Sequence, residues 1–287
     1  MNLMNEDFYQ PWRKQKLTLY PVLASDLRVD IQNADLPTQE EIEKLRAYLA
    51  RYNLALYRFI NQPQASKQQV HQLAQGMGLK NLAHNLCADV DSLTSIQVTQ
   101  HHGQHDYIPY TDKKLSWHTD GYYNAPNEQI HGMLLHCVRP AAQGGTSLLM
   151  DHEIAYILLR DANPAFIDAL LHPEAFTIPA NILNGETIRP AQTGPVFSFN
   201  PDGSLHMRYS VRQKHVIWRD DASTQAAAQF LLGLWQQASP YQLSYTLQAG
   251  EGLLCNNVLH CRTGFVDADE PEKKRLLYRG RYLERVN

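Results

Sequence analysis

The sequence lacks several features that would assign it to a broad class of protein. Its four cysteines, Cys87, Cys137, Cys255 and Cys261, form no CxxC pair, which argues against a disulfide framework and against a structural zinc site. Basic residues do not exceed acidic ones, since 26 Lys and Arg face 29 Asp and Glu. We therefore expect no nucleic-acid partner, because such a partner normally requires a basic patch or stripe.

Long hydrophobic runs are also missing. No apolar run approaches the roughly 20 residues that a membrane-spanning helix needs, and residues 1–16 lack the apolar region of a signal peptide. We expect a cytoplasmic protein with reduced thiols and no membrane partner. Repeats, low-complexity segments and linkers are absent as well, and the sequence is compatible with a homo-oligomer without specifying one.

Two helices are predicted in the first third of the chain. Thr38 and Glu41 form a capping box in front of a helical apolar repeat, and Ser66 and Gln69 form a second one. Gly78 is a plausible end for the second helix. Residues 53–60 form a strand-like run between the two helices, whereas residues 1–36 show no clear period.

From about residue 94 the pattern changes to short apolar or alternating runs separated by turn residues. These runs predict strands at 94–98, 132–138, 146–150, 196–199, 205–211, 241–247 and 252–254, interrupted by helices at about 151–172 and 223–237. The fold class is therefore mainly β with flanking helices. The simplest organisation is a single domain, 1–287, in which a mixed helical N-terminal part of about 1–93 packs on a double-stranded β core.

One spacing suggests a metal site. His118 and Asp120 stand at positions i and i+2 of an extended segment, so both side chains point to the same side. His260 follows a strand-like run about 140 residues later and can supply a third ligand. Two histidines and one carboxylate on one face of an octahedron form the facial triad of non-haem Fe(II) oxygenases, which leaves positions for a bidentate co-substrate and O2.

Two further features accompany the triad in a fixed order. Gly144-Gly145 allows a tight turn before a strand that carries hydroxyl groups, among them Ser147, which can bind a carboxylate. The segment 273–282 near the C-terminus carries Arg275 and Arg279 in or beside an apolar run. A guanidinium suits the distal carboxylate of 2-oxoglutarate, because it offers two parallel donors.

With these motifs the chain resembles the TauD/TfdA family of Fe(II)/2-oxoglutarate-dependent dioxygenases over about residues 38–283. The segments that carry the resemblance are LSWHTDGYY at 115–123, LHCVRPAAQGGTSLLMD at 135–151, NNVLHCRTGF at 256–265 and RLLYRGRYL at 275–283. The resemblance implies a jelly-roll core, the double-stranded β-helix. It also implies Fe(II) as cofactor, 2-oxoglutarate and O2 as co-substrates, and release of succinate and CO2.

The resemblance also implies roles for single residues. His118, Asp120 and His260 correspond to the iron ligands, and Arg275 to the residue that pairs with the distal carboxylate. Ser147 falls where relatives carry a hydroxyl that touches 2-oxoglutarate. Arg279 is the second arginine of the RxxxR pattern and would contact the substrate or support the co-substrate. Arg275 lies 15 residues after His260, at the long end of the family range, so Arg279 is the alternative partner of 2-oxoglutarate.

The substrate is less well defined. We expect a small polar molecule, acidic or zwitterionic, that is hydroxylated, with desaturation and cyclisation as open alternatives. Tyr122 and Tyr123 follow the metal motif and could wall the pocket, and Tyr107 could line its entrance. For Tyr107, ordinary packing is at least as good an interpretation. Arg212, on the alternating segment 208–212, could bind an acidic group, and simple exposure to solvent is an equally good interpretation.

Two other functions remain compatible with the sequence. One is a non-catalytic β-barrel protein that binds a metal or a ligand. The other is a cupin-like metalloenzyme that does not use a keto acid. Affinity for 2-oxoglutarate distinguishes the dioxygenase from both.

Overall fold

The structure is a computed structural model that describes residues 2–83, 93–98, 108–212 and 216–287. The chain forms two compact units, and each of them is discontinuous in sequence. Unit 1 comprises Met1–Tyr20, Ser116–Gln129 and Met150–Gln242, and unit 2 comprises Pro21–Leu115, Ile130–Leu149 and Leu243–Asn287. Both contain strands together with helices, in line with the predicted fold class.

A six-stranded sheet forms the centre of unit 2. Its strands follow the order β1 (Arg28–Ile31), β2 (Leu54–Phe59), β16 (Glu251–Cys255), β5 (Gly132–Arg139), β19 (Leu276–Tyr282) and β3 (Thr94–Ile96). β1 runs parallel to β2, and all the other pairs are antiparallel. The predicted N-terminal part therefore supplies two strands of this sheet, one of which, β1, the sequence pattern did not indicate.

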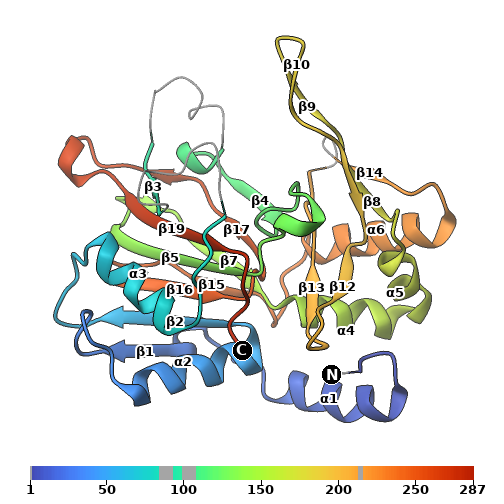
Figure 1. Ribbon diagram of the computed structural model, residues 1–287, viewed down its shortest axis with the longest axis horizontal. Coiled ribbons are helices and arrows are strands. Elements are labelled where there is room, and N and C mark those ends of the chain that lie inside the picture. Colours follow the sequence, from blue (N-terminus) through green and yellow to red (C-terminus); the bar gives the residue numbers. More distant parts are fainter. Residues whose placement is uncertain (1, 84–92, 99–107, 213–215) are drawn as a thin grey trace. The chain divides into compact units, whose positions relative to one another are not determined.

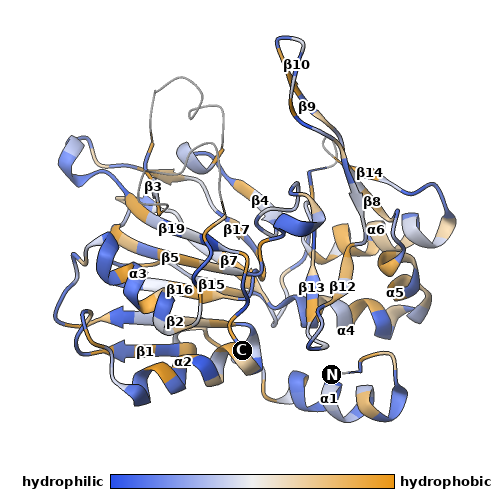
Figure 2. Ribbon diagram, viewed as in Figure 1, coloured by the Kyte–Doolittle hydropathy of each residue, from blue (hydrophilic) through white to orange (hydrophobic). Residues whose placement is uncertain are grey.

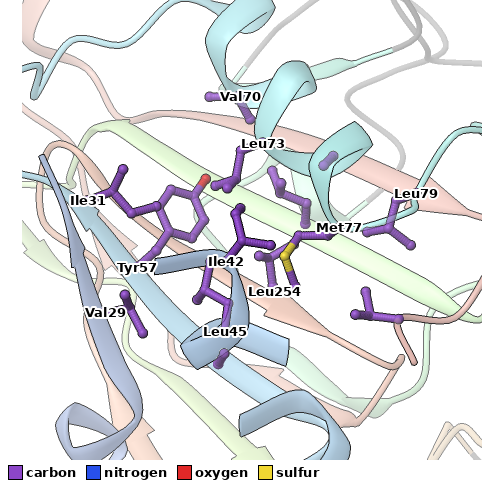
Figure 3. Close-up of a cluster of buried hydrophobic side chains, with 14 of the residues drawn as sticks. Val29, Ile31, Ile42, Leu45, Tyr57, Val70, Leu73, Met77, Leu79 and Leu254 are labelled. Atoms are coloured by element: carbon purple, nitrogen blue, oxygen red, sulfur yellow. The ribbon is translucent and has the colours of Figure 1, made fainter. Parts of the chain in front are cut away.

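Helices α2 (Gln39–Tyr52) and α3 (Lys67–Gly76) cover one face of this sheet (Figure 1). Both predicted capping boxes are confirmed, because the Thr38 and Ser66 side chains accept bonds from the third helical amide. The apolar residues of both helices pack in the core against the sheet. Hydrophilic residues alternate with them along each helix (Figure 2). Figure 3 shows Leu45 and Leu73 packed near Tyr57, which lies on the covered face.

A second group of strands in unit 2 carries the predicted Gly-Gly turn. β15 (Leu243–Tyr245), β7 (Ser147–Met150) and β17 (Leu259–Arg262) are consecutive neighbours in one sheet. The short β6 (Gln143–Gly144) pairs with β18 (Phe265–Val266). Short 3-10 helices occupy Ala24–Leu27, Ile108–Tyr110 and Pro271–Lys273.

Unit 1 is built around helices α1 (Glu6–Thr18), α4 (His152–Ala162), α5 (Pro164–Leu171) and α6 (Ala222–Leu234). The predicted helical stretch over about 151–172 is confirmed, but it consists of two helices. Asn163 ends α4 and caps α5, and Pro164 occupies the first turn of the new helix, where its missing N–H costs nothing. The unpredicted α1 packs on α4 through a buried ion pair, in which Lys16 Nζ lies 2.6 Å from Asp151 Oδ2.

Several small sheets complete unit 1. β8 (Phe176–Ile178) pairs with β11 (Gln192–Gly194) and β14 (Ile217–Trp218), and β12 (Phe197–Phe199) pairs with β13 (Leu205–Met207). β9 (Asn181–Leu183) and β10 (Glu186–Arg189) form a hairpin that extends well beyond the helices of this unit (Figure 1). β4 (Leu115–His118) precedes the short 3-10 helix Pro126–Glu128.

Two further observations concern the expected location of the protein. Cys137, Cys255 and Cys261 are buried thiols, whereas Cys87 lies outside the described residues. In the part of the chain that the structure describes, none of the helices combines the length and the hydrophobicity that a membrane crossing requires.

Candidate active site

The segment that carries His118 and Asp120 is fixed by strand pairing within unit 1. His118 and Ser210 form an antiparallel bridge, and Val211 donates its amide to the Trp117 carbonyl at 3.0 Å. Thr119 and residue 209 exchange two further bonds of 3.0 Å each. An extended segment held on one edge in this way keeps the alternation on which the prediction of a shared face depended.

The two candidate ligand atoms of this segment lie close together. His118 Nε2 is 3.4 Å from Asp120 Oδ1, and both side chains are buried. Neighbouring ligands of one octahedral ion, each about 2.1 Å from it, are separated by roughly 3 Å. The His118 ring is also oriented, because Nδ1 lies 2.8 Å from the Ser116 carbonyl oxygen. A carbonyl only accepts, so Nδ1 carries the proton and Nε2, which faces Asp120, is the nitrogen with the lone pair.

His260 repeats this arrangement in unit 2. It lies in β17, it is buried, and its Nδ1 is 2.9 Å from the carbonyl oxygen of Val258, again two residues earlier. The turn before it is rigid, since Asn257 adopts a left-handed φ of 50° and its side chain donates to the Ile130 carbonyl at 2.6 Å. The tautomer of His260 is therefore fixed in the same way as that of His118, with the proton on Nδ1.

The Gly-Gly turn and Arg275 come together in unit 2, as the order of motifs suggested. Gly144 has a φ of +76°, and a Cβ there would lie 2.4 Å from the Gly264 carbonyl oxygen, so this close approach requires glycine. A Cβ on Gly145 would lie 3.8 Å from Arg275 Nε. The hydroxyl-bearing strand β7 thus begins beside the Arg275 side chain.

Arg275 is buried, and its backbone amide donates to Asp267 Oδ1 at 2.6 Å. Its guanidinium lies over the Phe265 ring, with Cζ 4.9 Å from the ring centre. Among the described residues none accepts a hydrogen bond from this guanidinium. Burial lowers its pKa, against a smaller opposing effect of Cys137 and Asp267. A buried cation in this state is stabilised by an anion that supplies acceptors.

Arg279 has different surroundings. It pairs with Leu135 of β5 and Thr94 of the edge strand β3, and a register shift between Leu276 and Leu277 separates its part of β19 from Arg275. Ser147, at the start of β7, is partly exposed and pairs with Tyr245. The position beside the Gly-Gly turn therefore belongs to Arg275.

Arg262, two residues after His260, was not singled out from the sequence. Its Nη2 donates to the carbonyls of Thr111 at 2.9 Å and Lys113 at 2.5 Å, and its Cζ lies 4.8 Å from the Phe265 ring centre. Burial lowers its pKa to about 10, and the neighbouring charge of Arg275 acts in the same direction. Two guanidinium groups thus flank one aromatic ring and make this corner of unit 2 cationic. Arg262 could have been found from the sequence, because it lies within the same motif as His260.

The candidate substrate residues differ in their surroundings. In unit 1 the ring centres of Tyr122 and His118 are 6.3 Å apart, and those of Tyr122 and Tyr123 are 5.1 Å apart, both edge to face. Arg212 is partly exposed, and Tyr107 lies outside the described residues. Arg208, on the same alternating segment as Arg212, is buried.

The Arg208 guanidinium is already used by the protein. It donates to the carbonyls of Gln192 at 3.3 Å, Gly194 at 3.2 Å and Pro195 at 3.4 Å, as well as to Phe176. Desolvation lowers its pKa to about 10. Arg208 is therefore a structural residue of unit 1, and it leaves Arg212 as the arginine of this segment that could meet a ligand.

Comparisons with known proteins agree with this chemistry. The model of the "Taurine catabolism dioxygenase TauD, TfdA family" matches residues 15–281. A uridine-5'-phosphate dioxygenase from Amycolatopsis sp is 31% identical over 177 residues, which cover 58% of this chain and 60% of that protein. A uridine-5'-phosphate dioxygenase from Streptomyces sp is 30% identical over 203 residues, which cover 68% of this chain and 70% of that protein.

The fold has matches among solved structures. The crystal structure of the non-haem iron oxygenase OrfP in complex with Fe, succinate and (3S)-hydroxy-L-Arg has a TM-score of 0.64 and 16% identity, and the match covers 87% of this chain and 82% of OrfP. The predicted double-stranded β-helix class is thereby confirmed, with open sheets rather than closed barrels. The chain belongs to the taurine catabolism dioxygenase TauD/TfdA family and is a 2-oxoglutarate-dependent non-haem iron dioxygenase.

Proposed function

We propose that His118, Asp120 and His260 hold the Fe(II) ion and that Arg275 pairs with the distal carboxylate of 2-oxoglutarate. We further propose that the enzyme hydroxylates a nucleoside 5'-monophosphate or a closely similar phosphorylated small molecule. Bound Fe(II) supplies the activation of O2, coupled to decarboxylation of the keto acid. The protein supplies ligand geometry, charge and a site from which water is excluded.

The observation that carries the metal assignment is the matched orientation of the two histidines. Each donates Nδ1–H to the backbone carbonyl two residues earlier, at 2.8 Å for His118 and 2.9 Å for His260. Each therefore keeps Nε2 for a metal, and each of the three side chains offers one buried ligand atom. Two imidazoles and one carboxylate suit Fe(II), and they leave positions for a keto acid and O2.

The state of Arg275 supports its proposed role. A guanidinium buried over Phe265, without an acceptor among the described residues, is complementary to a carboxylate that arrives with the co-substrate. The Arg262 guanidinium, which also lies over the Phe265 ring, adds a second positive charge beside Arg275. For Arg279 we propose a substrate contact, which is one of the two roles, with support of the co-substrate, that the resemblance implies for the second arginine of the RxxxR pattern.

The substrate class is proposed from two supports. Two sequence relatives at 30–31% identity are named for uridine 5'-phosphate. A phosphate monoester fits the acidic substrate expected from the sequence, and Arg212 and Arg279 are guanidinium groups that could bind it. Free amino acids are the comparison class, because they share the small size and charge but lack phosphate.

The experiment follows succinate formation from 2-oxoglutarate with Fe(II) and O2, with uridine 5'-monophosphate or a free amino acid added. We expect the nucleotide to accelerate succinate release and to gain one oxygen atom by mass. His118→Ala, Asp120→Ala and His260→Ala should each abolish turnover. They should also abolish the visible charge-transfer band of the anaerobic complex of Fe(II) and 2-oxoglutarate. Unchanged turnover in any of the three variants would refute the ligand assignment.

We also propose that the two units work as one dioxygenase domain and that the enzyme is cytoplasmic. The chain passes between the units at residues 20/21, 115/116, 129/130, 149/150 and 242/243, so neither unit is a continuous segment. The family match spans segments of both. The buried thiols of Cys137, Cys255 and Cys261 support the proposed location, because a reducing compartment keeps thiols from forming disulfides.

A further inference from the structure

The hairpin of β9 and β10 is the most exposed element of unit 1. Its turn contains Asn184 and Gly185, both with positive φ, and it carries Ile182 and Leu183 with about three-fifths of each residue exposed. An isolated two-stranded hairpin is at best marginally stable in water. Contacts at its base must therefore fix its direction, and Arg189, the last residue of β10, provides them.

Arg189 joins the hairpin to the segment that follows the proposed metal ligands. Its Nη1 donates to the Tyr123 carbonyl at 3.3 Å, and its Nη2 donates to the Pro179 carbonyl at 3.0 Å, just before β9. Its Cζ also lies 5.4 Å from the centre of the Tyr123 ring. One planar side chain thus holds both the backbone and the ring of Tyr123, which a lysine cannot do with the same geometry.

The contacts continue from Tyr123 to His118 within the same unit. The Tyr123 ring packs edge to face on the Tyr122 ring at 5.1 Å, and Tyr122 packs edge to face on the His118 ring at 6.3 Å. Arg208 holds the Tyr122 carbonyl from the other side at 3.5 Å. The orientation of the tyrosine pair is therefore set by two arginines. Arg208 also donates to four other backbone carbonyls, whereas Arg189 belongs to the hairpin.

We propose that Arg189 is a positioning residue, which holds Tyr123 and Tyr122 in the orientation that packs against His118. The hairpin thereby sets the shape of the substrate side of the site. This inference rests on the proposed function, since it takes His118 as a metal ligand and the tyrosines as a wall of the substrate pocket. Through this wall, a change on the hairpin is expected to alter substrate binding while leaving 2-oxoglutarate binding unchanged.

The test compares Arg189→Ala, Arg189→Lys and the control Thr187→Ala, an exposed position of the same strand. The first readout needs no turnover: Co(II) replaces Fe(II), and its visible spectrum reports the ligand geometry. The second readout is the KM for uridine 5'-monophosphate against the KM for 2-oxoglutarate. Thermal melting shows that each variant is folded.

We expect Arg189→Ala to change the Co(II) spectrum and to raise the KM for the nucleotide about tenfold, the factor that one lost charge-assisted hydrogen bond corresponds to. The KM for 2-oxoglutarate should stay within about twofold, because Arg275 lies on other elements. Arg189→Lys should recover part of the loss, and Thr187→Ala should match the wild type. Arg189→Ala that matches the wild type in both readouts overturns the inference while the proposed function stands.

A double-mutant cycle separates positioning from a direct substrate contact. If Arg189 acts through Tyr123, Arg189→Ala combined with Tyr123→Leu should raise the nucleotide KM no more than Tyr123→Leu alone. A double variant whose increase in nucleotide KM equals the product of the two single increases would overturn the inference. If wild-type protein gives no Co(II) spectrum, or if His118→Ala leaves that spectrum unchanged, the proposed metal site is wrong and the positioning role falls with it.

Discussion

His136 should make the protein sensitive to acid. It lies in β5 on the helix-covered face of the six-stranded sheet, fully buried, with ring centres of Tyr57, Phe59 and Tyr278 at 5.8, 5.4 and 6.3 Å. Its Nδ1 is 3.1 Å from the hydroxyl oxygen of Tyr57. Burial lowers its pKa from 6.5 to about 4, because a charged imidazole is poorly solvated there.

The sign and size of the effect follow from this shift. The unfolded chain protonates His136 below pH 6.5, whereas the folded protein resists protonation down to about pH 4. The free energy of unfolding is therefore unaffected above pH 6.5 and falls as the pH is lowered towards 4. With 1.36 kcal/mol per pKa unit, the loss is about 2 kcal/mol between pH 7.5 and pH 5, and about 3 kcal/mol at its limit.

The assay is urea unfolding of metal-free protein at several pH values between 7.5 and 5, for the wild type, His136→Gln and Tyr57→Phe. Metal-free protein removes the contribution of proton competition at the proposed iron ligands. His136→Gln has no titrating ring, so it should lose about 2 kcal/mol less than the wild type over this range. Tyr57→Phe keeps the buried imidazole and should keep the acid sensitivity. Parallel pH profiles for the wild type and His136→Gln would refute the reasoning.

Three further predictions concern single contacts. Arg275→Lys should raise the KM for 2-oxoglutarate at least about tenfold in the succinate assay, since the paired donors are lost, and an unchanged KM would exclude the proposed carboxylate contact. Gly252→Ala places a Cβ 2.1 Å from the buried Tyr57 ring and should lower the free energy of unfolding by about 2–3 kcal/mol. Its control, Gly233→Ala, has open space in α6 and should be neutral or stabilising by up to about 1 kcal/mol, so equal melting temperatures would contradict the clash. Thr38→Ala should cost about 1 kcal/mol in urea unfolding through the lost N-cap bond of α2, and no change would show that this cap is dispensable.

Local rules explain why part of the fold could be predicted. The boxes at Thr38 and Ser66 place donor and acceptor three residues apart, and helix geometry alone makes them meet. The break at Asn163-Pro164 follows an equally local rule, because asparagine caps a helix and proline suits its first turn. The apolar repeat continues across this break in 151–172, so it did not indicate that two helices are present. By contrast, β1 has four residues and pairs in parallel with β2 across α2, so its status as a strand depends on a distant partner.

The sequence by itself determined the identity and order of the metal and carboxylate motifs, because strand alternation puts His118 and Asp120 on one side and charge chemistry selects arginine for a carboxylate. Tertiary structure decided which groups are available. The alternating segment 208–212 does not distinguish its two arginines, yet packing buries Arg208 among backbone carbonyls and leaves Arg212 partly exposed. Likewise, Arg275 rather than Arg279 lies at the Gly-Gly turn, because strand register sets their neighbours. Burial and hydrogen-bond partners come from residues far apart in the chain, so no local pattern could specify them.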